Sequence, residues 1–157
     1  MIFFKRKWRG LIVELQDVDK QLQLASIKLS MARNLMHDRK RRASFLSNVT
    51  VITAMHGLPV TPDMLGSLFV RDAHNSLRSV IRRLKWICDK VREDPKYFRI
   101  IRDIEILIKD CEELLKVANP QELLNNVDNI RSRLRELLVE VEGIEFISRS
   151  YQSIQNK

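Results

Sequence analysis

The stretch LIVELQDVDKQLQLASIKLSMARNLM, residues 11–36, shows the fold most directly. Its apolar side chains recur at alternating intervals of four and three residues, at Leu11, Leu15, Val18, Leu22, Ala25, Leu29, Ala32 and Met36. This interval gathers them on one side of an α-helix, while Asp, Lys, Gln and Arg fill many positions between them. The pattern therefore predicts a helix over about residues 9–36 that packs against other helices along its whole length.

Three later segments repeat this interval, over about residues 62–93, 96–118 and from Pro120 onward. Proline-containing breaks separate them, at residues 57–63, Asp94-Pro95 and Asn119-Pro120, because proline favours the first turn of a helix and stops a preceding one. A further helix is expected over residues 43–56. The first helix either turns near residues 34–38 or runs on to Met55, and we favour the turn because Arg39 interrupts the apolar interval.

These patterns predict an all-α fold that consists of an elongated helical hairpin plus additional helices. We expect four to five helices in all, each with a heptad-like seam, that is, a row of apolar residues along one side of the helix. Four regions follow. Residues 1–9 form an amphipathic membrane-binding N-terminus, residues 10–93 the long hairpin core and residues 94–147 the C-terminal helices. Residues 148–157 form a polar tail that we expect to be partly disordered in isolation.

Composition limits the class of protein. The chain has 157 residues, of which 45% are apolar and 31% charged, and it holds only 4 Gly and 4 Pro, as expected for a single helical domain. No apolar run approaches the roughly 20 residues of a membrane-spanning helix, and the N-terminus lacks the features of a signal peptide. Cys88 and Cys111 occupy apolar positions, so we expect buried thiols in a reducing, intracellular setting.

No catalytic pattern is evident. His37, His56 and His74 lack the spacing of a metal or nucleophile site, and no glycine-rich phosphate loop is present. The acidic groups near Glu112 and Glu140 lack the accompanying histidines of a di-iron site. We therefore expect a protein that is not an enzyme and has no cofactor or metal.

Charge is distributed unevenly along the chain. Residues 1–99 carry 20 Lys/Arg against 9 Asp/Glu, whereas residues 100–157 carry 8 against 11, and the net charge is +8. The basic half predicts an anionic partner. Two basic clusters in this half are candidates for contact with lipid headgroups, with nucleic acid or with the acidic half of a neighbouring subunit. The remaining interpretation is a solvated basic face without a ligand. The clusters consist of Arg39, Lys40, Arg41 and Arg42, and of Arg78, Arg82, Arg83 and Lys85.

The N-terminus combines bulky apolar residues with positive charge. Such a segment suits the boundary between lipid headgroups and acyl chains, and the alternative is that its aromatic residues cover the end of the helical bundle. The candidate membrane-binding residues are Ile2, Phe3, Phe4, Lys5, Arg6, Lys7, Trp8 and Arg9. Long apolar seams also predict self-assembly, through Leu15, Val18, Leu22, Leu29, Leu77, Ile81 and Leu84.

Several segments, in this order, resemble the ESCRT-III family, particularly the archaeal division proteins called CdvB. The apolar and basic start, residues 1–7, is similar to the membrane-inserting N-terminus of many members. Residues 38–49 resemble the opening of the family's second helix, residues 77–87 its LRL-x-x-I segment, and residues 137–140 a short motif in a later helix. The resemblance covers about residues 1–145.

This resemblance implies a cytoplasmic subunit, peripheral on the inner face of the membrane, that polymerises with itself and with paralogous subunits to remodel membrane during cell division. Two other functions remain open on the sequence alone. One is a helical protein that coats nucleic acid, such as the coat subunit of a filamentous archaeal virus. The other is a helical adaptor that binds another protein.

Overall fold

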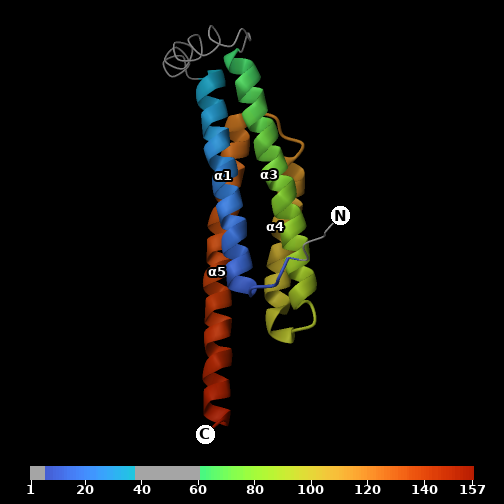
Figure 1. The fold of residues 1–157 in the computed structure, drawn as a ribbon, viewed down its shortest axis with the longest axis vertical. Helices are drawn as coiled ribbons and strands as arrows, with labels where there is room; N and C mark the ends of the chain where they lie inside the picture. Colours follow the sequence, from blue (N-terminus) through green and yellow to red (C-terminus); the bar gives the residue numbers. More distant parts are fainter. Residues whose placement is uncertain (1–5, 38–60) are drawn as a thin grey trace.

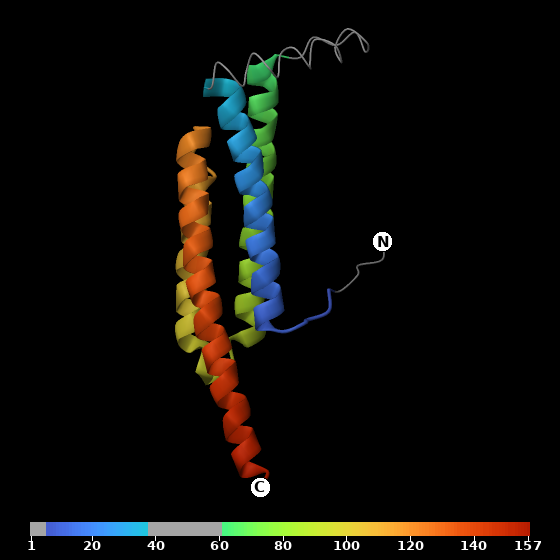
Figure 2. The same cartoon turned by 90° about the vertical axis from the view of Figure 1, so that its left-hand side faces the viewer.

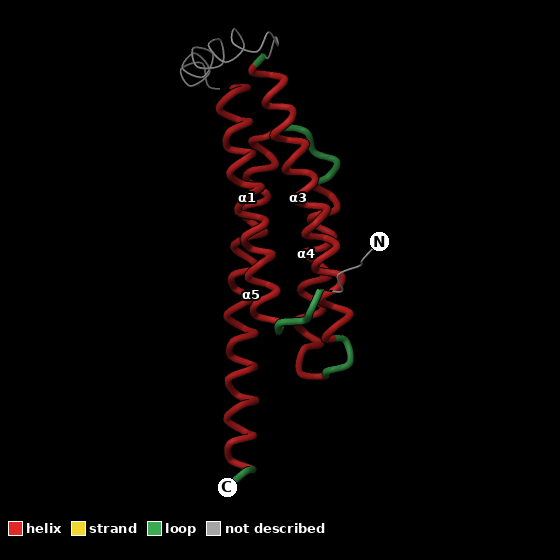
Figure 3. The backbone as a smooth tube through the Cα atoms, viewed as in Figure 1, coloured by secondary structure: helices red, strands yellow, loops and turns green. Residues whose placement is uncertain are grey.

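The computed structural model describes residues 6–37 and 61–157, and in these ranges every regular element is a helix (Figures 1 and 3). The long helices are α1 (Leu11–His37), α3 (Pro62–Val91), α4 (Phe98–Leu114) and α5 (Pro120–Gln155), and a short 3-10 helix, η1 (Pro95–Tyr97), joins α3 to α4. The all-α class and the hairpin of long helices with additional ones are thus confirmed. The expected helix 43–56 and residues 57–60 of the first break lie outside the described ranges.

The predicted starts of α3 and α5 are confirmed, and a side chain caps each of them, whereas α4 begins at Phe98 without a side-chain cap. The Thr61 hydroxyl accepts a hydrogen bond from the Met64 amide (3.2 Å), and Pro62 occupies the first turn of α3. The Asn119 side chain accepts hydrogen bonds from the amides of Gln121 and Glu122 at the start of α5. Because these amides have no partner within the helix, each cap fixes where its helix begins.

The four long helices form an antiparallel bundle. Helix α1 lies between α3 and α5, and α4 also contacts both, so α3 and α5 occupy diagonal positions (Figures 1 and 2). Polar contacts fix the register: Lys28 pairs with Asp72 of α3 (3.5 Å), and Ser26 donates a hydrogen bond to Asp128 of α5 (2.9 Å).

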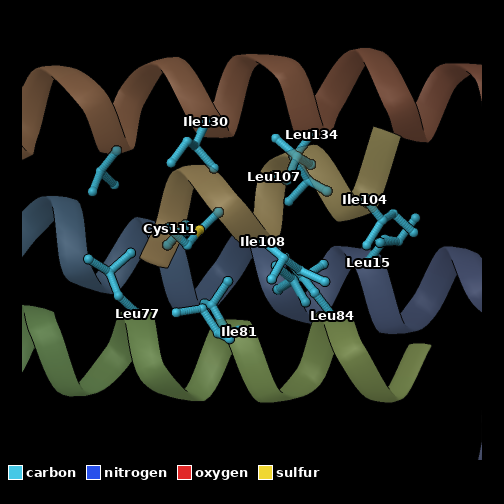
Figure 4. Close-up of a cluster of buried hydrophobic side chains, with 14 of the residues drawn as sticks. Leu15, Leu77, Ile81, Leu84, Ile104, Leu107, Ile108, Cys111, Ile130 and Leu134 are labelled. Atoms are coloured by element: carbon cyan, nitrogen blue, oxygen red, sulfur yellow. The ribbon is translucent and has the colours of Figure 1, made fainter. Parts of the chain in front are cut away.

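The apolar seams of the four long helices form the core of a single subunit. All seven predicted self-assembly residues are buried inside one subunit, among them Leu15, Leu22 and Leu77, each with no exposed surface. Figure 4 shows Leu15, Leu77 and Leu84 within this core. The assignment of this seam to self-assembly is therefore wrong for this conformation. Its residues, Leu15, Val18, Leu22, Leu29, Leu77, Ile81 and Leu84, pack against the seams of α4 and α5, whose apolar faces close the bundle.

Helix α5 continues past the predicted end of the C-terminal helices. It runs to Gln155 without a break, so the polar tail expected over residues 148–157 is helical for most of its length. Val141 is the last fully covered core residue of α5, and the final turns project beyond the other helices (Figures 1 and 2). At 1.5 Å per residue, this projecting end is about 20 Å long.

Candidate functional site

The N-terminal arm, residues 6–10, lies against the bundle. The ring of Trp8 packs edge-on against the ring of Trp86 in α3, with centroids 5.4 Å apart. Arg6 binds Asp17 (2.8 Å), and Arg9 binds Glu14 (3.1 Å) and also Asp17. Carboxylates of the first turns of α1 therefore hold the arm, which places its indole on α3.

Glu14 is a buried carboxylate at the centre of this attachment. Its side chain is fully covered, and three guanidinium groups lie around it: Arg9, Arg6 (3.5 Å) and Arg83 of α3 (3.6 Å). A carboxylate without solvent needs such partners, because an unpaired charge inside a protein is costly. The cluster thus ties the arm, α1 and α3 together.

The predicted membrane-binding residues divide into three groups. Ile2, Phe3, Phe4 and Lys5 lie outside the described ranges. Lys7 is exposed. Arg6 and Arg9 contact α1, and Trp8 contacts α3. These contacts agree with the alternative in which the N-terminus covers the bundle. In this conformation the Trp8 ring is half-buried and is packed against the core.

The predicted basic cluster of α3 does not form one face. Arg78, Arg82 and Lys85 are exposed, but the side chain of Arg83 is only 10% exposed and turns toward Glu14 and Asp17. Its assignment to a basic face is wrong, because Arg82 and Arg83 are adjacent and so point to different sides of the helix. Arg39, Lys40, Arg41 and Arg42 lie outside the described ranges.

One further arginine belongs to the exposed basic face. Arg71 precedes Arg78 by seven residues, so the two share one side of α3, and it too is exposed. Arg71, Arg78 and Arg82 form no ion pair with any described residue, whereas Lys85 pairs with Glu112 of α4 (3.1 Å). The seven-residue spacing was the available signal for Arg71.

The second exposed surface is the projecting end of α5. Phe146, Ile147, Tyr151 and Ile154 are each more than 60% exposed. Ile147, Tyr151 and Ile154 recur at intervals of four and three residues in the sequence, but the many polar neighbours concealed this pattern. Exposed apolar residues gathered in this way are typical of a surface that contacts a partner.

The described residues offer little for catalysis. They contain no group of three or more His, Cys, Asp or Glu side chains placed to hold a metal. Cys88 and Cys111 are free and buried, and burial raises the pKa of Cys88 to about 11 and that of Cys111 to about 12, which disfavours the nucleophilic thiolate. In the same ranges no helix has the length and apolar character needed to span a bilayer.

Comparisons with known proteins give no match to a family model, to a curated protein or to a solved structure.

Proposed function

We propose that this protein is a subunit that assembles with copies of itself at an anionic membrane surface and thereby remodels the membrane. The observation that carries the proposal is the projecting end of α5, which exposes four large apolar side chains beyond a bundle whose core is already complete. A helix extended into solvent with an apolar side is stabilised when a partner covers that side.

The closed core changes how assembly is achieved. The buried seams cannot join subunits in this conformation, so contacts must use outer surfaces of the bundle. Each such contact is small, and many of them in a polymer add through avidity, which is how a weakly binding subunit holds a membrane.

The N-terminus is the proposed membrane contact. Residues 1–9 combine Ile2, Phe3 and Phe4 with four basic residues, and each basic residue near anionic lipid contributes on the order of 1 kcal/mol. The arm is held by ion pairs to Asp17 and to the buried Glu14 and by one aromatic contact. Membrane binding of Trp8 would require exchange of the Trp86 contact for lipid. The resemblance to ESCRT-III proteins supports the same assignment.

Co-sedimentation with vesicles tests this function. Wild-type protein should pellet with vesicles that contain phosphatidylserine and remain in solution with phosphatidylcholine alone. The double variant F3S/F4S should lose most of the binding, since it removes the apolar contact and keeps every arginine of the Glu14 cluster. A matched variant, Phe98→Ser, removes an exposed aromatic residue of α4 and should bind as wild type does. Equal binding by both variants would exclude the N-terminus as the contact.

One observation favours a second candidate, binding to nucleic acid. Arg71, Arg78 and Arg82 lie along one side of α3 without acidic partners among the described residues, and such a line can neutralise successive phosphates. A gel shift that weakens steeply with salt, and that the R78E/R82E variant abolishes, would favour this function over membrane binding.

A further inference from the structure

The outer side of α3 carries a second seam, distinct from the one in the core. Its members recur at intervals of four and three residues, and all are exposed. The first two are apolar and the later ones are polar or basic. In chain order this α3 outer seam consists of Met64, Leu68, Arg71, Asn75, Arg78 and Arg82.

Helix α5 has an outer seam with the same intervals between residues, but its charged residues come first and its apolar residues come last. Two acidic residues come first, and small and apolar residues follow on the projecting end. Ser150 is half-buried and the others are exposed, and a Cβ atom added at Gly143 would have nothing within 4 Å. The α5 outer seam consists of Glu136, Glu140, Gly143, Ile147, Ser150 and Ile154.

The two seams can be aligned at six positions when the helices run antiparallel. The apolar Met64 then meets the apolar Ile154, and Arg78 and Arg82 meet the two glutamates, whereas Arg71 lies opposite an apolar residue. Seams with alternating intervals of four and three pack side by side in this way in coiled coils. The pairs are Met64 with Ile154, Leu68 with Ser150, Arg71 with Ile147, Asn75 with Gly143, Arg78 with Glu140, and Arg82 with Glu136.

The charged members have no ion pair with any described residue of their own subunit. Arg78 donates a hydrogen bond only to Asn75 (2.9 Å), and Arg82, Glu136 and Glu140 have no ionic partner in the part of the chain that the structure describes. Most other acidic residues in the middle of the bundle are paired, for example Asp110 with Arg133. Two unpaired arginines and two unpaired glutamates at matching positions are complementary surfaces that one subunit cannot bring together, because α3 and α5 are diagonal in the bundle.

We propose that the α5 outer seam of one copy docks antiparallel on the α3 outer seam of a second copy. This inference rests on the proposed self-assembly and names its contact. The two seams border α4 from its two sides: Arg78 and Arg82 line a groove with Glu112 of α4, and Glu136 and Glu140 line a groove with Arg99 of α4. The contact joins two different surfaces, so it generates a chain of subunits when the two seams bind different neighbours and a reciprocal dimer when both bind the same one.

Charge reversal in the full-length protein tests the contact. The state of assembly is measured by light scattering after gel filtration, and on phosphatidylserine vesicles by negative-stain microscopy. The variants R78E/R82E and E136R/E140R should each weaken self-association roughly 30-fold, since about 2 kcal/mol is lost when two charge pairs become repulsive. The quadruple variant R78E/R82E/E136R/E140R, which exchanges the charges of both seams, should restore self-association.

Mixing provides the sharper outcome. Each double variant retains one intact seam, but the two retained seams belong to different variants. An equimolar mixture of R78E/R82E and E136R/E140R should therefore assemble as wild type does, because native seam pairs and charge-exchanged seam pairs then form between the two variants, whereas an unrelated contact would give no new species. Control variants are Glu142→Arg, on another side of the same projecting helix, and Arg102→Glu, exposed on α4; both should assemble as wild type does.

The outcomes separate this inference from the function on which it rests. Assembly of wild type that neither double variant weakens would overturn the α3–α5 contact and leave self-assembly in place. A wild-type protein that stays monomeric at every concentration and on vesicles would overturn both.

Discussion

Trp8 packs edge-on against Trp86, with ring centroids 5.4 Å apart, and so attaches the N-terminal arm near the C-terminal end of α3. The ammonium group of Lys90 lies 5.8 Å from the centre of the same Trp86 ring. An aromatic contact of this kind contributes about 0.5–1.5 kcal/mol beyond the area that it buries. The membrane-binding candidate Trp8 therefore has a defined place in the free subunit.

Replacement of Trp8 by alanine should release the arm and leave the bundle folded. The expected loss in the free energy of unfolding is about 1–2 kcal/mol, from one half-buried aromatic contact. Limited trypsin digestion is the direct measurement, because cleavage after Arg6, Lys7 and Arg9 should become faster. Phe98→Ala, at an exposed aromatic residue, is the control. Unchanged cleavage in Trp8→Ala would mean that the ion pairs alone hold the arm.

Substitution Glu14→Gln should destabilise the protein far more than its surface counterparts. Glu14 is fully covered and faces Arg6, Arg9 and Arg83. The neutral amide loses these ion pairs, although Asp17 still pairs with all three arginines. Loss of the partners of one buried polar group costs about 1–3 kcal/mol. Urea unfolding measures the loss, and Glu93→Gln, at an exposed position, should change the midpoint little. Equal midpoints would contradict the structural role of the cluster.

The sequence predicted the helices well, because their signals are local. Thr61-Pro62 and Asn119-Pro120 carry cap and first-turn chemistry that works whatever the rest of the chain does. The apolar interval identified Leu15, Leu22 and Leu77 as seam residues. It could not say whether another copy or the same chain covers them, since both arrangements bury the same side of the helix.

The surfaces were harder to predict, because they depend on the relative positions of the helices. Arg83 belongs to a run of basic residues, yet the rotation of α3 in the bundle turns it toward Glu14. Glu14 itself gave no signal, as it looks like an ordinary first-turn acid until Arg6 and Arg9 are placed beside it. Ile147 and Tyr151 were hidden by polar neighbours, and only the projection of α5 shows that they are exposed.

Two neighbouring leucines of α1 can test where the seam is buried. Leu22 has no exposed surface, whereas Leu24 is 56% exposed. Leu22→Ala should lower the free energy of unfolding by about 3 kcal/mol, as for other large-to-small changes in a core, and Leu24→Ala by less than about 0.5 kcal/mol. Thermal unfolding at a low protein concentration, where subunits are separate, is the measurement. A loss for Leu22→Ala that appeared only at high concentration would place the seam between subunits instead.

The two buried thiols predict how stability depends on alkaline pH. Burial raises the pKa of Cys88 from 9.0 to about 11 and that of Cys111 from 9.0 to about 12, so the folded protein binds these protons more tightly than the unfolded chain does. Their contribution is complete below pH 9 and is lost as the pH rises toward 11 or 12, where the unfolded chain gains by ionising first. Tyr97 acts in the same direction, because burial and the carboxylate of Glu145 raise its pKa to about 12.

The urea concentration at the midpoint of unfolding should fall steadily for wild type between pH 9 and pH 11. The midpoint of C88A/C111A, taken relative to its own value at pH 9, should fall less steeply. A thiol-specific disulfide reagent should react with both cysteines only at the rate of unfolding, since neither thiol is exposed. Fast reaction of the folded protein would contradict the burial of at least one thiol. An equal pH slope in wild type and in C88A/C111A would assign the alkaline loss to Tyr97, which Tyr97→Phe would then remove.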